Sequence, residues 1–247
     1  MSDALPTIPL SSLWLAFLPG LVLIGLMKRW QLSGWEAVYA NVRMLLQLLA
    51  VGYVLTFVFE TKQPAVVIAV FVVMMGVAAR IAMRPIAGRG ARVYAIVLAA
   101  IGLNGFGMLI LVTQVILDLP RWFEPRFTVP LAGMIFANTM NTVSLAAERF
   151  ESELRHHENA FDARRVALEA ALIPQINALL AVGLVSLPGM MTGQILSGIE
   201  PMVAVRYQIM VMCMVFGSGG LGAATYLAMV TPRAAPRVER EAHEVDH

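Results

Sequence analysis

Ionisable side chains inside long apolar runs are the residues of this sequence best placed to bind or pass a solute. Glu36, Arg43 and Gln47 follow one another at intervals of seven and four, a spacing that puts them on one face of a helix. A charged group at the centre of a bilayer costs about 2.5–3.5 kcal/mol on insertion scales, so each is a functional hypothesis. Two roles stay open for this face: a polar pathway, or a structural pair of Glu36 with Arg43, whose stem can also reach the membrane surface.

Amide side chains in other apolar runs form a second group. Asn138 and Asn141 are three residues apart and share a helical face, while Asn104 and Gln175 lie in separate runs. Such amides either line a pathway or hold helices together by hydrogen bonds, and the second role is at least as common. The candidates for a substrate path are Glu36, Arg43, Gln47, Asn104, Asn138 and Asn141.

Catalytic machinery is not evident in the sequence. All the histidines lie in hydrophilic segments, neither lysine follows the glycine spacing of a phosphate-binding loop, and the single Cys213 allows no internal disulfide or cysteine-based zinc site. We interpret Gly217-Ser218-Gly219 as a helix-packing motif rather than a serine nucleophile. The net charge of +2 gives no basic field for nucleic acid. We therefore expect no enzyme and no cofactor bound by this chain.

The composition indicates a membrane protein. Of 247 residues, 59% are hydrophobic and only 14% charged, with a mean hydropathy of +0.74, whereas soluble domains are nearer half apolar and a quarter charged. A helix needs about 20 apolar residues to cross the hydrocarbon layer. The runs of that kind predict an all-α, polytopic protein with about seven spans, at 8–27, 35–59, 64–83, 93–117, 128–146, 170–187 and 202–230.

Lysine and arginine in the connecting loops predict the orientation. Twelve fall in alternate loops and in the C-terminal segment, against Lys62, Arg121 and Arg126 in the opposing loops. This bias predicts an N-terminus outside and a C-terminus in the cytoplasm. We expect one transmembrane domain over 1–230 and a disordered cytoplasmic tail over 231–247. The sixth run is expected to end at Pro188, and 188–200 fits either a re-entrant segment or an outer-surface hairpin.

A charged connection over about 147–169 links the fifth and sixth runs. Phe150, Leu154, Phe161 and Leu168 recur at helical spacing among acids and bases in nearly equal number. A helix lying on lipid would favour a basic polar face, so the balance favours docking to a soluble protein. The segment is thus predicted to be a cytoplasmic helical docking surface.

Two blocks of sequence resemble a known family. The stretch from Gly133 to Leu145, GMIFANTMNTVSL, resembles the G-M-x-x-G-N-x-M-N-x-x-S-L segment of FetB-like permeases, with Ala137 in place of a family glycine. The second block comprises Ala170 to Pro174 and Val182 to Leu196, AALIP and VGLVSLPGMMTGQIL. FetB-like permeases are membrane subunits of a small ABC transporter family linked to iron export, with relatives among plant aluminium-tolerance proteins.

The resemblance implies that the charged connection is the coupling loop that meets a separately encoded P-loop ATPase, which would bind the ATP. Aligned back from Pro174, Glu151 takes the place of the loop glutamate and His157 that of a glycine that normally provides a turn. We hypothesise a homodimeric permease of the cytoplasmic (inner) membrane that moves iron or a related metal outward. The candidates for ATPase coupling are Glu151, Leu154, His157, Phe161, Arg164 and Arg165.

Another class of transport protein stays open on the sequence alone. A nucleotide-independent channel or secondary transporter would need no ATPase. The scarcity of titratable groups inside the apolar runs counts against it, because such carriers use these groups as proton or sodium relays.

Overall fold

The computed structural model describes residues 9–61, 63–86, 90–155 and 159–245. The chain divides into two compact units, Met1–Thr61 and Lys62–His247. The units are described separately below. The expectation of a single domain over 1–230 stays a prediction, because helices of one membrane domain can form separate units.

Unit 1 contains α1 (Leu10–Leu13), the 3-10 turn η1 (Trp14–Phe17), α2 (Leu18–Arg29) and α3 (Trp35–Glu60). The expected first span at 8–27 is therefore broken into pieces, of which α2 has only 12 residues. The turn between α2 and α3 brings their backbones close, since a Cβ at Gly34 would lie 3.3 Å from Cγ2 of Ile24. Most apolar side chains of α3 are exposed within the chain, as expected for a surface that lipid or protein covers.

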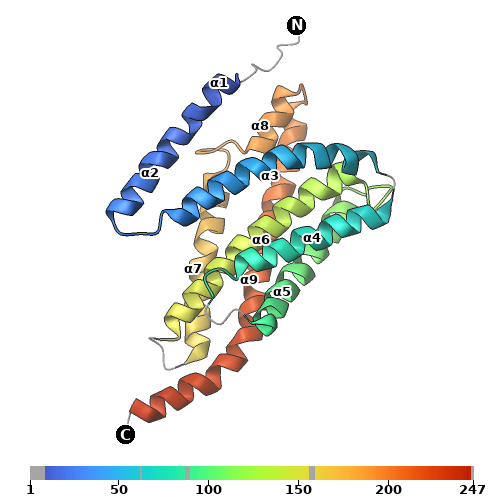
Figure 1. The fold of residues 1–247 in the computed structure, drawn as a ribbon. Helices are drawn as coiled ribbons and strands as arrows, with labels where there is room; N and C mark the ends of the chain where they lie inside the picture. Colours follow the sequence, from blue (N-terminus) through green and yellow to red (C-terminus); the bar gives the residue numbers. More distant parts are fainter. Residues whose placement is uncertain (1–8, 62, 87–89, 156–158, 246–247) are drawn as a thin grey trace. The chain divides into compact units, whose positions relative to one another are not determined.

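Unit 2 is a helical bundle built around α6 (Pro125–Glu153). This helix packs against α4 (Pro64–Ala82), α5 (Ala91–Ile110), α7 (Ala160–Ala181) and α9 (Pro201–Val245), as Figure 1 shows. The π-helical turn η2 (Leu111–Ile116) extends α5, and the short α8 (Gly189–Leu196) packs on α9. Proline, which is preorganised for the first helical position, begins α4, α6 and α9.

Small residues let the helices of unit 2 approach closely. Ala160, Ala163, Ala167 and Ala171 recur every three or four residues along α7, and each is at most 1% exposed. Such a stripe allows backbone-to-backbone packing without a large side chain between the helices. The α7 helix is therefore held tightly against α6 and α9, its neighbours in the bundle.

Four helices of the described residues are long and apolar enough to cross a membrane: Trp35–Glu60, Pro64–Ala82, Ala91–Ile116 and Pro201–Ala234. They coincide with four of the expected spans. Three expected spans are not among these helices, namely 8–27, 128–146 and 170–187. The first is broken into short pieces, and the other two lie in helices that also carry charged residues and amides. The protein is an all-helical, polytopic membrane protein, and the count of seven spans stays a prediction.

Two helix ends differ from expectation. The α7 helix ends at Ala181 rather than at Pro188, because Gly183 adopts a φ of +84° and the amides of Val185 and Ser186 turn back to the carbonyl of Ala181. Pro188 instead precedes α8, which forms most of the unassigned segment 188–200 as a helix. The α9 helix continues to Val245, through most of the segment expected to be a disordered tail. Alanine, arginine and glutamate in that segment favour helix.

Candidate functional site

An interhelical cluster of polar side chains joins α6, α7 and α9. Asn138 Nδ2 donates to the carbonyl of Val215 at 2.6 Å, and Gln175 Nε2 donates to Asn138 Oδ1 at 2.8 Å and to Thr142 Oγ1 at 2.9 Å. Thr142 in turn donates to the backbone carbonyl of Asn138 at 2.9 Å. One amide on each of α6 and α7 thus ties three helices together.

The backbone around this cluster is adapted to hold it. A Cβ at Gly219 would lie 2.5 Å from Asn138 Nδ2 and 2.8 Å from Thr142 Oγ1, so only glycine lets α9 come this close. On α7, Pro174 removes the hydrogen bond that its position would otherwise give to the carbonyl of Ala170. Ser218, the candidate nucleophile set aside above, is buried and donates to Val215 O at 3.3 Å, which agrees with a packing role.

Of the predicted path residues of unit 2, Asn104 and Asn138 form hydrogen bonds between helices, whereas Asn141 is exposed. Asn104 on α5 donates to Thr225 Oγ1 at 3.0 Å and to the carbonyl of Ala100 at 2.8 Å, so it links α5 to α9. Asn138 belongs to the cluster, whereas Asn141 is exposed on α6. The expected neighbour pair Asn138 and Asn141 is therefore not the interacting pair, and Asn138 interacts with Thr142 and Gln175 instead.

The predicted path residues of unit 1 all lie on α3. Glu36 is exposed in the first turn, Arg43 is half-buried, and Gln47 is exposed. Arg43 and Gln47 line one hollow of about 370 Å³ together with Tyr39, Val42, Leu46 and Ala50. The structure thus keeps Arg43 and Gln47 together on one side of α3, with Glu36 outside the hollow.

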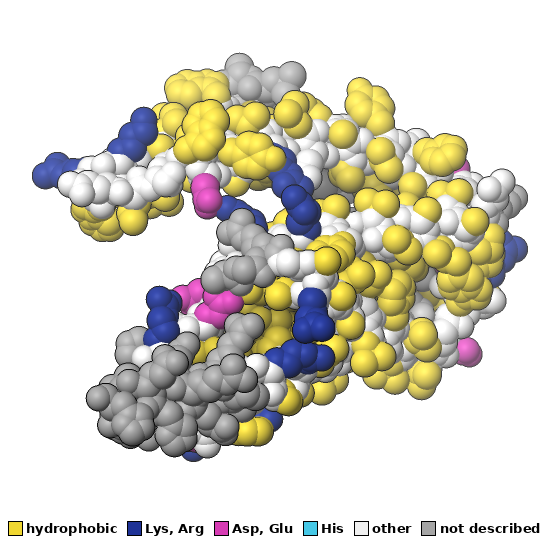
Figure 2. All heavy atoms as spheres, turned by 60° about the horizontal axis from the view of Figure 1, so that its bottom comes forward, with side chains coloured by type: hydrophobic (Ala, Val, Ile, Leu, Met, Phe, Trp, Pro, Cys, Tyr) yellow, Lys and Arg dark blue, Asp and Glu magenta, His cyan; other side chains and the backbone are white. Residues whose placement is uncertain are grey.

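The predicted coupling residues surround the connection between α6 and α7. Leu154 follows the last residue of α6, Arg164 lies over the ring of Phe161 with 5.1 Å between Cζ and the ring centroid, and Arg165 is exposed. Glu151 is half-buried, and His157 lies outside the described residues. In Figure 2, acidic and basic side chains gather at the end of unit 2 that is turned forward, while hydrophobic side chains cover much of its flank.

Phe150 and Phe161 do not share a face, contrary to the sequence pattern. Phe150 is 3% exposed and belongs to the core, whereas Phe161 is 48% exposed. The pattern assumed a continuous helix, but α6 ends at Glu153 and α7 begins at Ala160, where Asn159 caps it by accepting from the amide of Phe161 at 2.9 Å.

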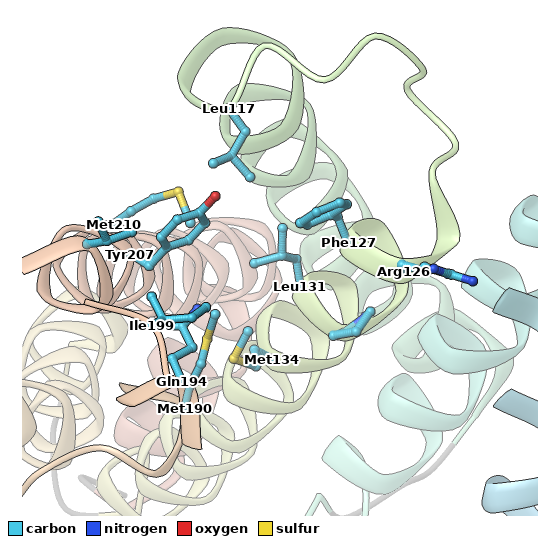
Figure 3. Close-up of a pocket in the computed structure, with 12 residues that line it drawn as sticks. Leu117, Arg126, Phe127, Leu131, Met134, Met190, Gln194, Ile199, Tyr207 and Met210 are labelled. Carbon is cyan, nitrogen blue, oxygen red and sulfur yellow. The ribbon is translucent and has the colours of Figure 1, made fainter. Parts of the chain in front are cut away.

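A pocket of about 620 Å³ opens near the start of α6 and α9. Figure 3 shows Phe127 and Leu131 of α6 on one side, Tyr207 and Met210 of α9 on the other, and residues of and after α8 below them. The lining is mainly apolar, and the residues that contribute it are Leu117, Arg126, Phe127, Pro130, Leu131, Met134, Met190, Gln194, Ile199, Val203, Tyr207 and Met210. Its size is typical of small-molecule sites, which span about 300–1,000 Å³.

None of the residues that line this pocket is among the path or coupling candidates of the sequence analysis. Gln194 stands in the segment left without an assigned structure, and only the fold of α8 brings it next to α6 and α9. Its Oε1 is buried without a hydrogen-bond partner among the described residues, as is Oε1 of Gln208 on α9. Within the described residues, no group of three or more His, Cys, Asp and Glu side chains is placed to hold a metal ion.

Comparison with known proteins gives a consistent family assignment. A family model described as "Uncharacterised protein family (UPF0014)" matches residues 10–234. The chain is 34% identical over 220 residues to the UPF0014 membrane protein slr1647 of Synechocystis, covering 82% of this chain and 85% of that one. No solved structure matches the chain.

Two further relatives carry descriptive names. Over 194 residues the chain is 31% identical to the probable iron export permease protein FetB of Escherichia coli, covering 72% of this chain and 73% of FetB. Over 217 residues it is 28% identical to the Arabidopsis protein ALUMINUM SENSITIVE 3, covering 80% of this chain and 76% of the relative.

Proposed function

Because the chain belongs to the UPF0014 family of multi-pass membrane proteins, we propose that it is the permease subunit of an ABC transporter that exports iron or a related metal. In this proposal the chain works as a homodimer in the cytoplasmic membrane, with its N-terminus outside and its C-terminus inside. A separately encoded P-loop ATPase binds and hydrolyses the ATP, and this chain holds no cofactor and catalyses no reaction.

The relatives support the type of cargo. One is named as a probable iron export permease and another for sensitivity to aluminium. Both names concern metal ions, and the family match extends over nearly the whole chain. The cargo of this permease is therefore proposed to be a metal, free or complexed.

The continuity of α7 is the observation that best supports an ATP-driven cycle. One helix, in which Pro174 removes a single backbone hydrogen bond, carries Arg164 and Arg165 near its start, and Gln175 follows Arg165 by ten residues, a distance of about 15 Å along the axis. Its buried alanine stripe and the bonds of Gln175 to Asn138 and Thr142 fasten it to α6. A force applied at the arginines therefore moves α6 and α7 as one rigid body rather than bending a loop.

The charged end of the bundle suits a soluble partner. Arg149 and Glu153 form an ion pair of 2.5 Å across one turn of α6, and Arg164 covers the ring of Phe161. Arg165 extends into solvent beside them. Mixed charges around an exposed aromatic ring are typical of a protein interface, in which arginine and aromatic residues contribute most of the binding energy.

The polar cluster suits transit rather than storage of a cation. Hard cations are held by carboxylates together with carbonyl oxygens, including those of Asn and Gln. The cluster has no carboxylate, and its Asn138 Oδ1 and Thr142 Oγ1 already accept hydrogen bonds from Gln175. A strong metal site inside the bundle would hold the cargo and oppose its release. We propose that the cluster couples helix movement to opening of the path, with Asn138 and Gln175 exchanging partners during the cycle.

The proposal is tested by co-purifying the permease with the ATPase and by measuring ATP-driven iron flux in vesicles. The double variant Arg164→Glu and Arg165→Glu reverses charge at the docking surface and is expected to lower retention of the ATPase at least tenfold, with normal membrane insertion. Arg121→Glu, an exposed arginine in the loop before α6, is the matched control and should retain the ATPase.

Two results would contradict the proposal. Equal retention of the ATPase by the double variant and the control would show that Arg164 and Arg165 do not form the docking surface. Iron flux that proceeds at full rate without nucleotide would instead support the nucleotide-independent channel or secondary transporter.

A further inference from the structure

We infer that the pocket between α6, α8 and α9 is a binding site for an amphipathic organic anion that also carries a hydrogen-bond donor. The inference concerns a ligand site distinct from the ATPase surface and from the polar cluster. It goes beyond the proposed transport function, since binding here requires neither nucleotide nor metal.

The pocket has a polar and an apolar part along the helices that form it. On α6, Arg126, Leu131 and Met134 line it, so the lining runs from a charged residue to a thioether over about 12 Å. On α9, Val203, Tyr207 and Met210 recur at helical spacing and face the same space. A ligand that matches this arrangement has an apolar body and a charged group at one end.

Arg126 determines the sign of that charge. Its side chain is exposed, and within the described residues no carboxylate pairs with it. Figure 3 shows its guanidinium directed away from the other labelled residues, at the edge of the pocket. A carboxylate, sulfonate or phosphate at this edge would form a charge-assisted hydrogen bond, which is roughly twice as strong as a neutral one.

Gln194 requires a donor from the ligand. Its Oε1 is buried and has no partner among the described residues, although the residue lines the pocket. A buried acceptor left without a partner is destabilising, so a ligand hydroxyl or amine that donates to it removes that penalty. A purely hydrocarbon ligand, such as a lipid acyl chain, would leave the oxygen unpaired.

The same lining disfavours a bare metal cation. None of the lining residues is a carboxylate, and the one charged side chain is positive. Hard cations need anionic oxygen ligands, and a positive charge at the edge repels them. The ring faces of Phe127 and Tyr207 and the thioethers of Met134, Met190 and Met210 instead offer a polarisable surface to an organic body.

Binding of three eight-carbon probes to the full chain in lipid nanodiscs tests the inference. The probes are 8-hydroxyoctanoate, which has both groups, octanoate, which lacks the hydroxyl, and 1-octanol, which lacks the carboxylate. Empty nanodiscs correct for partition into lipid. We expect 8-hydroxyoctanoate to bind about three- to tenfold more tightly than octanoate, the range of one net hydrogen bond. We expect it to bind about ten- to a hundredfold more tightly than 1-octanol, because the charge-assisted bond is about twice as strong.

Two variants assign the two preferences to residues. Gln194→Leu should abolish the advantage of 8-hydroxyoctanoate over octanoate and leave octanoate affinity unchanged, which also shows that the pocket has kept its shape. Arg126→Gln should abolish the advantage of 8-hydroxyoctanoate over a neutral diol, 1,8-octanediol, and preserve the hydroxyl preference. Arg121→Gln, outside the pocket, should change neither.

Three results would overturn the inference. Equal affinity of the wild-type chain for 8-hydroxyoctanoate and octanoate would show that Gln194 accepts no hydrogen bond from the ligand. This comparison uses only the wild-type chain, so it holds even if a variant does not fold. A hydroxyl preference that survives Gln194→Leu places the donor contact elsewhere. Equal affinity of the pocket for all three probes, with displacement of each by phosphatidylcholine, which has neither a net negative charge nor a hydrogen-bond donor, makes the pocket a lipid groove. None of these results depends on the ATPase, so the proposed transport function stands or falls separately.

Discussion

Replacing Asn138 by leucine should destabilise the bundle, whereas the same change at Asn141 should not. Asn138 donates to Val215 O at 2.6 Å and accepts from Gln175 at 2.8 Å. Asn141, one turn further along α6, is exposed. The two substitutions have identical chemistry and differ only in what the side chain touches, so Asn141→Leu is the control for Asn138→Leu.

The magnitude follows from the bonds that are lost. Interhelical hydrogen bonds in membrane proteins contribute about 0.6 kcal/mol on average and about 1.7 kcal/mol at most, so two of them give about 1–3 kcal/mol. The carbonyl of Val215 loses this donor, and Gln175 keeps only its bond to Thr142. Substitution at an exposed site usually changes the free energy of unfolding by less than about 0.5 kcal/mol.

Reversible unfolding in mixed micelles, followed by circular dichroism over a denaturant series, measures the free energy of unfolding of both variants. The reasoning predicts a difference of at least about 1 kcal/mol between Asn138→Leu and Asn141→Leu, from the bond energies above. Equal destabilisation, or a loss below about 0.5 kcal/mol for Asn138→Leu, would show that the cluster does not hold the helices together.

Two further pairs of substitutions test the packing by the same unfolding measurement. Gly222→Ala places a Cβ 2.3 Å from Cγ2 of Thr139 and should cost about 1–3 kcal/mol, whereas Gly107→Ala, with nothing within 4 Å of its Cβ, should be neutral or slightly stabilising; equal effects would contradict the α6–α9 contact. Phe150→Ala removes a core side chain and should cost about 3–5 kcal/mol, whereas Phe161→Ala should cost under about 1 kcal/mol. A large loss of stability for Phe161→Ala with little for Phe150→Ala would contradict the burial of Phe150 and the exposure of Phe161.

Apolar composition alone predicts where the long helices lie, but it does not predict where every helix ends. The long runs that became α3, α4 and α9 follow from hydropathy alone, because an uninterrupted apolar run folds locally. The end of α7 depended on a turn at Gly183 with a positive φ, which a glycine permits but does not dictate. Pro188, which the sequence predicts as the end of the sixth run, therefore precedes α8 and does not end α7.

Residues of the candidate site could be predicted only where the sequence of a single helix identifies them. Asn138 stood out because an amide inside an apolar run calls for a partner, and the partner was found. Which residue would be that partner depended on how α6 and α7 meet, and helical spacing along α6 suggested Asn141 instead of Gln175. The pocket could not be predicted, because Arg126 and Gln194 are far apart in sequence and meet in one site only through the packing of three helices.

The α9 helix connects the two sites that the structure brings together. Val215 accepts the bond from Asn138, and Tyr207, eight residues or about 12 Å earlier on the same helix, lines the pocket. A displacement of α7 must either carry Asn138 and α9 with it or break the bonds through Gln175. If in the first case the wall of the pocket that α9 provides shifts relative to α8, a ligand in the pocket and a partner at the charged end would bias the same equilibrium, and each would change the other's binding free energy by the same amount.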